Sequence, residues 1–188
     1  MIGGTQRRRE LKAPRVKGLR PTSDRVREAM FDILASLGAV EGSTVLDLFA
    51  GSGALGIEAL SRGAESAVFV DDDRRCLDAV RANLAATGFD VPGRSRVVLA
   101  DAPALVERGA LAHVDLALVD PPYRFEEWPR LLGSLDADLA VLESSSEVPA
   151  AGGFRVRRVY RYGGTLVTLV EAIRTSDANP KLPDEDPF

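Results

Sequence analysis

Short apolar runs alternate with helical patterns from Thr44 onward, and this alternation restricts the fold more than any other feature of the sequence. The runs that we expect to be strands are Thr44 to Phe49, Ser66 to Asp71, Arg96 to Ala100, Asp115 to Val119 and Leu139 to Glu143. Strands that alternate with helices form a parallel sheet with helices on both faces. The sequence therefore predicts an α/β fold of the Rossmann-like type, with a mostly parallel sheet.

Helical spacing of apolar residues predicts helices over Ala54 to Arg62, Arg74 to Ala86, Pro103 to Arg108 and Glu126 to Leu135. Upstream, residues 20–37 begin with polar capping residues and then place apolar side chains on one face, which indicates an amphipathic helix before the first strand. Downstream, Phe154 to Tyr162 and Thr165 to Ala172 are joined by Gly163-Gly164, which predicts an antiparallel hairpin. This hairpin would complete a seven-stranded sheet.

The distribution of charge divides the chain into three parts. The first 30 residues hold nine basic and three acidic side chains, although the net charge of the 188 residues is −4. Clustered cations favour a polyanionic partner, because binding releases counterions; a solvated terminus is the alternative. We expect a basic N-terminal extension over residues 1–37, a catalytic domain over residues 38–174 and a disordered acidic tail over residues 175–188.

The composition excludes several classes of protein. No stretch approaches the roughly 20 apolar residues that a membrane span needs, and the polar start lacks the apolar region of a signal peptide, so we expect a cytoplasmic protein. Cys76 is the only cysteine and lies in a helical pattern, which favours a packed thiol. His113 is the only histidine, and we expect a structural or surface role for it and no bound metal.

A glycine-rich turn follows the first predicted strand. Residues 47–56 read DLFAGSGALG, and the G-x-G-x-x-G pattern by itself favours a dinucleotide. The carboxylate of Asp47, however, would oppose a pyrophosphate, whereas it can hold the ammonium group of an amino-acid cofactor directly or through water. This favours S-adenosylmethionine as the cofactor and S-adenosylhomocysteine as the product, with a nicotinamide dehydrogenase as the weaker alternative.

Aspartates also follow or end the later strands. Asp71 can accept from both ribose hydroxyls of either cofactor class, and the Asp101 carboxylate with the Ala102 amide suits the edge of an adenine. Because ligands of open α/β sheets bind at the carboxyl ends of strands, Asp47, Asp71, Asp101 and Asp120 would line one crevice. The candidate cofactor-binding residues are Asp47, Phe49, Ala50, Gly51, Gly53, Asp71, Asp72, Asp101 and Ala102, and Asp72 and Asp73 would also carry charge at a helix N-terminus.

The fourth predicted strand ends in Asp120-Pro121-Pro122-Tyr123. Neither proline has an N–H group, so the turn presents carbonyl oxygens without competing donors. The Asp120 carboxylate and a proline carbonyl can each accept one hydrogen of an exocyclic amine, and the Tyr123 ring can stack on the base. An ordinary strand-ending turn is the alternative interpretation of the same residues.

These motifs together resemble those of the class I S-adenosylmethionine-dependent methyltransferases that methylate exocyclic or amide nitrogens. Within that class, Arg20-Pro21-Thr22-Ser23-Asp24-Arg25-Val26-Arg27-Glu28-Ala29-Met30-Phe31, followed by residues 45–53, is similar to the RsmD family, the bacterial 16S ribosomal RNA guanine-N2 methyltransferases. The resemblance covers residues 7–172. Two departures are a looser match over residues 1–9 and Asp71 in place of the commoner glutamate.

The resemblance implies methyl transfer to a guanine N2 of 16S ribosomal RNA, within the small subunit, by a monomer. It assigns Asp120, Pro121 and Tyr123 to catalysis; the RNA-binding candidates are Arg20, Thr22, Arg25, Arg27, Pro122, Arg155 and Arg157. We further expect that Asp120→Ala abolishes transfer and that Asp71→Ala weakens cofactor binding. The alternatives are an adenine-N6 nucleic-acid methyltransferase, a protein-glutamine methyltransferase and a catalytically silent RNA-binding or assembly factor.

Overall fold

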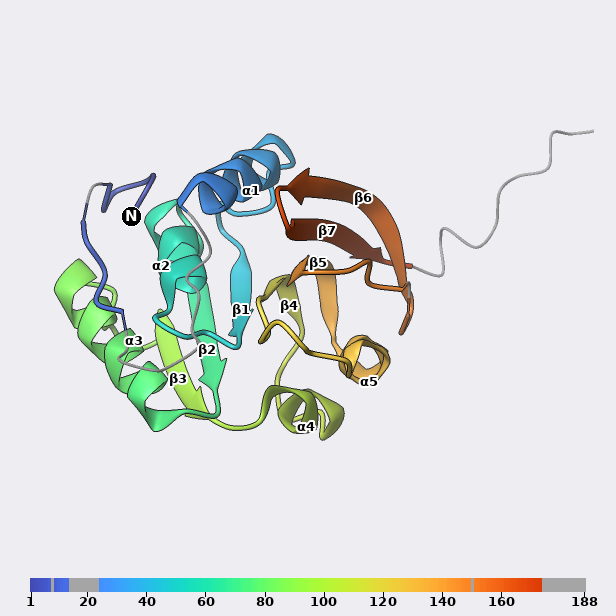
Figure 1. The fold of residues 1–188 in the computed structure, drawn as a ribbon. Helices are drawn as coiled ribbons and strands as arrows, with labels where there is room; N and C mark the ends of the chain where they lie inside the picture. Colours follow the sequence, from blue (N-terminus) through green and yellow to red (C-terminus); the bar gives the residue numbers. More distant parts are fainter. Residues whose placement is uncertain (8, 14–23, 150, 174–188) are drawn as a thin grey trace, which may run out of the picture.

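The computed structural model describes residues 1–7, 9–13, 24–149 and 151–173, and it confirms the predicted α/β sheet (Figure 1). The helices are α1 (Asp24–Ser36), α2 (Ala54–Ser61), α3 (Arg74–Thr87), α4 (Ala102–Glu107) and α5 (Trp128–Ser134). The strands are β1 (Thr44–Leu48), β2 (Ser66–Asp71), β3 (Ser95–Leu99), β4 (Val114–Val119), β5 (Ala137–Ser144), β6 (Phe154–Tyr162) and β7 (Thr165–Ala172). The first four residues of the predicted 20–37 helix and the 175–188 tail lie outside the described residues.

The sheet has seven strands in the order β3-β2-β1-β4-β5-β7-β6. Strands β1 to β5 pair in parallel, whereas β7 pairs antiparallel with both β5 and β6. The hairpin and β2 have the predicted bounds, and the other strands differ from the prediction only at their ends. The strand order reverses between β1 and β4, which is the point at which ligands of open α/β sheets bind.

The helices cover the sheet from two sides, because alternate residues of each strand point to opposite faces. One core packs α1, α2 and α3 against one face, with Phe31, Ile57 and Leu77 fully buried in it. The other core packs α4 and α5 against the second face around Leu131 and Leu132. In the described part of the chain, no helix is long and apolar enough to cross a membrane.

The N-terminal segment, which we define as residues 1–7 and 9–13, lies beside α2 and α3 (Figure 1). The fully buried carboxylate of Glu58 on α2 accepts hydrogen bonds from the amides of Ile2 at 2.9 Å and Gly3 at 2.7 Å. Ser61 Oγ accepts from the Gln6 amide at 2.9 Å. The start of the chain is therefore attached to the α/β core by its backbone.

Candidate functional site

The glycine loop and the Asp120 turn lie side by side at the carboxyl edge of the sheet. β1 leads into the loop and β4 into the turn, and these two strands are neighbours. Directly after the strands, the Asp120 amide donates to the Leu48 carbonyl at 3.4 Å. The structure thus brings together the two predicted motifs at the point where the strand order reverses.

Two glycines show why the loop needs this sequence. Gly53 has a φ of 76°, a left-handed conformation that favours glycine, and it precedes the first residue of α2. A Cβ on Gly56 would lie 2.4 Å from the Phe69 ring and 3.0 Å from Asp47 Oδ2. The helix can therefore approach the sheet closely, and its first turn faces the end of β1.

Asp47 is buried under the glycine loop and is not exposed on the side of the loop that faces solvent. It is the fourth residue of β1, is 1% exposed and accepts a hydrogen bond from the Gly56 amide at 2.9 Å. Burial raises its pKa well above the ordinary value; the Gly56 hydrogen bond opposes this, and the Asp120 and Asp71 carboxylates add to it. Asp47 therefore supports the loop through the Gly56 amide, and its predicted contact with a cofactor ammonium, directly or through water, stays a prediction.

Asp71 ends β2, as predicted, and its two carboxylate oxygens accept from two different backbone amides. Oδ2 accepts from Gly51 at 2.8 Å and Oδ1 from Asp73 at 2.9 Å. Asp73 in turn caps α3 by accepting from the Arg75 amide, whereas Asp72 is exposed and precedes the helix. The Cys76 thiol also hydrogen-bonds to the Asp71 carboxylate. A carboxylate has about four acceptor sites, so one is left for a ribose hydroxyl, and ribose binding by Asp71 stays a prediction.

Asp101 follows β3 and is the N-cap of α4. Its Oδ1 accepts from the Ala104 amide at 2.9 Å, and the side chain is exposed, whereas Ala102 is buried in the second core. Capping of α4 thus uses one oxygen of the Asp101 carboxylate. Its predicted contact with an adenine stays a prediction.

The Asp120 turn presents its groups at the surface. Asp120 and Pro121 are half-buried, Pro122 is exposed and the Tyr123 side chain is 66% exposed. The Pro122 carbonyl accepts from the Phe125 amide at 2.9 Å, which folds the turn back on itself. Tyr123 extends toward the β6–β7 turn, because a Cβ on Gly164 would lie 3.7 Å from its hydroxyl oxygen.

Aromatic rings connect the glycine loop to the Asp120 turn, a contact that no motif in the sequence predicts. Phe49, in the glycine loop, contacts Phe125 with 5.2 Å between centroids, and Phe125 contacts Trp128 with 5.0 Å. Both contacts are edge-on, the geometry that aromatic pairs prefer. Phe49 is also the only described non-glycine residue with a positive φ, at 60°. Sequence spacing gives no signal for such a contact between loops.

The predicted RNA-binding residues of the N-terminal block divide into different environments. Arg20 and Thr22 lie outside the described residues, and Arg25 is exposed in the first turn of α1. Arg27, by contrast, is 7% exposed and pairs with Asp24 at 2.6 Å, while its Nε has no hydrogen-bond partner among the described groups. Arg27 thus lies on the buried face of α1 and pairs within the protein, and its predicted contact with RNA stays a prediction.

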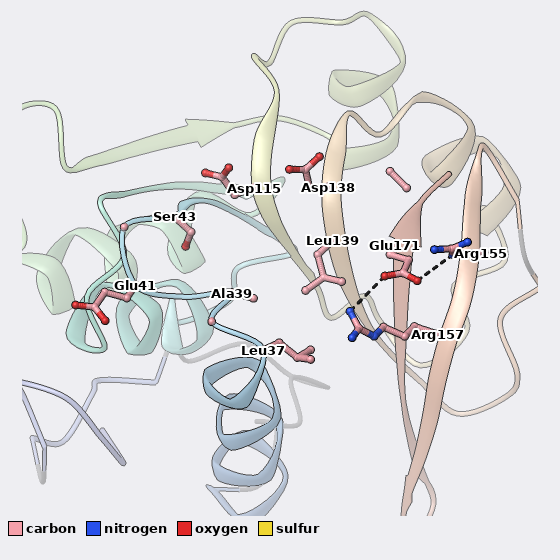
Figure 2. Close-up of a pocket in the computed structure, with 13 residues that line it drawn as sticks. Leu37, Ala39, Glu41, Ser43, Asp115, Asp138, Leu139, Arg155, Arg157 and Glu171 are labelled. Carbon is pink, nitrogen blue, oxygen red and sulfur yellow. Dashed lines mark hydrogen bonds and ion pairs between the residues drawn. The ribbon is translucent and has the colours of Figure 1, made fainter. Parts of the chain in front are cut away.

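Arg155 and Arg157 lie at the edge of the sheet opposite Asp120. Both pair with Glu171, at 2.9 Å and 3.3 Å, and they line a cavity of about 430 Å³ beside the amino ends of β1, β4 and β5 (Figure 2). Arg161, near the other end of β6, is level with the end of β5 and shares the Asp120 edge. Arg155 and Arg157 thus lie away from the Asp120 turn, and their predicted contact with RNA stays a prediction.

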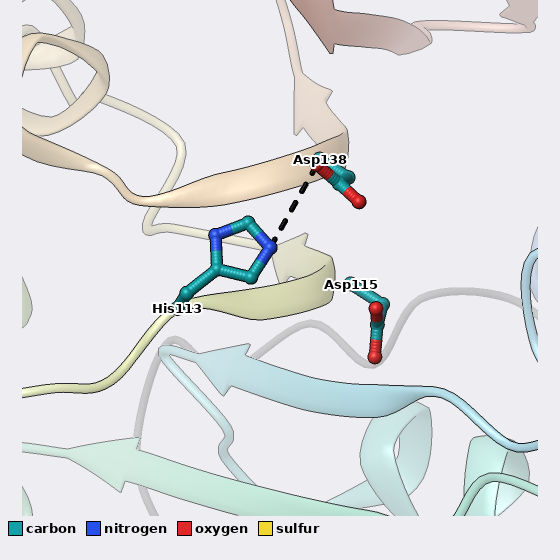
Figure 3. A group of neighbouring side chains, drawn as sticks. All are labelled: His113, Asp115 and Asp138. Carbon is teal, nitrogen blue, oxygen red and sulfur yellow. Dashed lines mark ion pairs between the residues drawn. The ribbon is translucent and has the colours of Figure 1, made fainter.

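His113, Asp115 and Asp138 converge at that same opposite edge (Figure 3). Each offers one ligand atom within 4.8 Å of the others, and His113 Nε2 lies 3.7 Å from Asp138. A hydrogen bond to Asp136 raises the pKa of His113, while Thr44 donates two bonds to Asp115. Partners within the protein thus account for this exposed group, which lies away from the candidate site.

Comparisons with known proteins agree with this geometry. The family model described as "Conserved hypothetical protein 95" matches residues 1–170. The chain is 42% identical over 154 residues to ribosomal RNA small subunit methyltransferase D of Escherichia coli K12, which covers 79% of this chain and 74% of that protein. It is 33% identical over 173 residues to YlbH of Bacillus subtilis, which covers 91% of both. The chain is 34% identical to yhhF from Escherichia coli, whose structure is solved. The match covers 92% of this chain and 96% of that chain, with a TM-score of 0.76.

Proposed function

The chain belongs to the RsmD family of class I methyltransferases, and from this membership we propose that it methylates the exocyclic N2 of a guanine in 16S ribosomal RNA. S-adenosylmethionine is the proposed methyl donor. The observation that carries the proposal is the adjacency of the glycine loop and the Asp120 turn at the reversal of strand order. A methyl donor bound at the glycine loop would therefore lie next to an amine held by the Asp120 turn.

The charges at the site support a cationic cofactor. Burial, and then Asp120 and Asp71, raise the pKa of Asp47, so three acidic side chains lie near one another at the carboxyl ends of neighbouring strands. A ligand with a sulfonium and an ammonium group would relieve this repulsion. We infer that residues 49–53 hold the cofactor backbone, that Asp71 accepts from its ribose hydroxyls, and that Asp101 and Ala102 face its base.

The chemistry that the cofactor supplies is an electrophilic methyl group on sulfur. The guanine amine is a weak nucleophile, because its lone pair is delocalised into the ring. In the proposed mechanism the Asp120 carboxylate and the Pro121 carbonyl accept its two hydrogens, which favours a pyramidal nitrogen aimed at the methyl group. Asp120 also stabilises the positive charge that develops on the nitrogen during in-line transfer.

The base must leave its stack to reach the turn. Tyr123 is 66% exposed, so its ring is available as a replacement stacking surface. Three exposed cations of the N-terminal segment, together with Arg25 and Arg161, are the described basic residues that we propose as phosphate contacts. The three are Arg7, Arg9 and Lys12. In this proposal residues 1–37 form an RNA-binding extension, and a monomer acts on the assembled small subunit.

The experiment that tests the proposal is methyl incorporation from labelled S-adenosylmethionine into small subunits from cells that lack the enzyme. Digestion to nucleosides should place the label on N2-methylguanosine. Label on N6-methyladenosine would mean that the modified base is adenine and not guanine. Binding of S-adenosylhomocysteine without incorporation into subunits or naked RNA would contradict the enzymatic proposal in favour of a silent binding protein.

A further inference from the structure

Asn83 on α3 connects the N-terminal segment to the glycine loop. Its side chain is buried, with 1% of the residue exposed, and both of its polar atoms are used. Nδ2 donates to the Ser52 carbonyl and to the Lys12 carbonyl, each at 2.9 Å, while Oδ1 accepts from the Lys12 amide at 2.8 Å. One amide group therefore holds both backbone groups of Lys12 and one carbonyl of the loop.

The connection joins two parts of the proposed site with different tasks. Ser52 lies between Gly51 and Gly53, at the centre of the loop assigned to the cofactor. The side chain of Lys12 is exposed, so its backbone is fixed by Asn83 while its charge faces solvent. The earlier residues of the segment are held separately by Glu58 and Ser61, neither of which is bonded to the loop.

We propose that Asn83 is a positioning residue that couples cofactor binding to the placement of the basic N-terminal segment. A cofactor that orders the glycine loop would fix the Ser52 carbonyl and, through Nδ2, strengthen the hold on Lys12. By linkage, a segment held in place by RNA would favour the ordered loop to the same extent. This inference rests on the proposed function, because it takes the loop to be the cofactor site.

The hydrogen-bond pattern explains why an asparagine suits this position. Asparagine offers two donors and an acceptor in one plane, and all three bonds use them. Aspartate keeps the acceptor for the Lys12 amide but replaces the donor group with an oxygen that faces two carbonyls. Asn83→Asp therefore removes the bridge at constant shape.

Thr87 provides a matched control one turn later on α3. It is 2% exposed, and its hydroxyl donates only to carbonyls of its own helix, those of Asn83 at 2.7 Å and Leu84 at 3.1 Å. Thr87→Val therefore removes a buried hydroxyl from the same helix without touching the loop or the segment. Its effects measure the general cost of altering α3.

The test measures amide hydrogen exchange by nuclear magnetic resonance, with and without S-adenosylhomocysteine, and the affinity for that ligand by calorimetry. In the wild-type protein we expect the ligand to slow exchange at Lys12 by about tenfold more than at a loop-independent position of the segment such as Gln6. In Asn83→Asp this excess should vanish, and affinity should fall about tenfold. Thr87→Val should keep both within about twofold of the wild type.

Three results would overturn the proposed coupling through Asn83, and a fourth would contradict the proposed cofactor. If the ligand binds the wild-type protein and Lys12 gains no more protection than Gln6, the coupling does not exist, whatever the variants do. Retention of the excess protection in Asn83→Asp, or its equal loss in Thr87→Val, would also overturn it. A wild-type protein that binds no S-adenosylhomocysteine would instead contradict the proposed cofactor.

Discussion

The ring of Phe49 meets the ring of Phe125 edge-on, with 5.2 Å between centroids and 66° between planes. Phe49 belongs to the glycine loop, and the amide of Phe125 closes the Asp120 turn through the Pro122 carbonyl. The contact therefore sets the distance between the proposed site of the methyl donor and the proposed site of the amine. A small displacement of either ring would lower the rate of methyl transfer more than the affinity for the cofactor.

We expect Phe125→Leu to lower kcat for methyl transfer by about tenfold to a hundredfold, because misplacement of reacting groups by about 1 Å has that effect. The affinity for S-adenosylhomocysteine, measured by calorimetry, should stay within a few-fold. Phe89→Leu is the control, since Phe89 is a buried ring whose aromatic contact is with Arg94, away from both loops. Equal losses of kcat in the two variants would mean that only general stability had changed.

Asp120→Ala should separate chemistry from cofactor binding. Removing the carboxylate takes away an acceptor for the amine and the charge that stabilises the transition state, and we expect a loss of about 10²- to 10³-fold or more in kcat. The affinity for S-adenosylhomocysteine should change by no more than several-fold. Asp120→Asn, which retains the shape, should also be impaired. Full activity in the alanine variant would sink the proposed mechanism.

Asp71→Ala should mainly weaken cofactor binding, in contrast to Asp120→Ala, which should mainly lower kcat. The variant leaves the Gly51 and Asp73 amides without their acceptor and removes the proposed partner of the ribose hydroxyls. We expect affinity for S-adenosylhomocysteine to fall by about tenfold to a hundredfold, which corresponds to roughly one or two such hydrogen bonds. Asp78→Ala, at an exposed acidic position of α3, is the control. Unchanged affinity in Asp71→Ala would remove Asp71 from the cofactor site.

The parts of the fold that were predictable are those with a local signal. The Gly163-Gly164 turn of the hairpin and the glycine turn after β1 depend on neighbouring residues, and β6 and β7 have the predicted bounds. The meeting of the loop and the Asp120 turn also followed, because parallel strands bring their carboxyl ends to one edge. Periodicity and topology together were sufficient for this level of detail.

The contacts that could not be predicted from the sequence are those that depend on three-dimensional position. Charge alone did not distinguish the buried Arg27 from the exposed Arg25, although Arg27 lies four residues before Phe31 on the core face. The strand pattern also could not say which end of β6 lies beside Asp120. The bonds between Asn83 and the Lys12 backbone link distant segments and leave no periodic trace in the sequence.

The two ends of β6 should differ in their effect on RNA binding. Arg161 shares the Asp120 edge, and its exposed ion pair with Glu147 is of a kind that contributes little to stability. We expect Arg161→Ala to raise KM for the small subunit and to lower the slope of log affinity against log salt by about 0.7–0.9 for the lost phosphate contact. Arg157→Ala, at the opposite end, is the control. A larger effect of Arg157→Ala would place the RNA on the other edge.

Asp47→Asn should make the protein more stable but a weaker binder of the cofactor. Asparagine can still accept from the Gly56 amide, and it avoids placing a charge in a buried position beside Asp71 and Asp120. Because the folded-state pKa of Asp47 is raised, the wild-type protein loses stability relative to the variant as pH rises from the ordinary carboxyl pKa through the folded value.

The advantage of Asp47→Asn should therefore be greatest at neutral and alkaline pH and vanish below about pH 3, where the carboxyl is protonated in both the folded and the unfolded wild-type chain. Thermal melts from pH 5 to 8 should show the variant melting a few degrees higher, about 2–4 °C for each kcal/mol gained. Affinity for S-adenosylhomocysteine should fall, because the support below the loop has lost its charge. A variant that melts lower than the wild type at pH 8 would instead mean that the ionised carboxylate stabilises the empty loop.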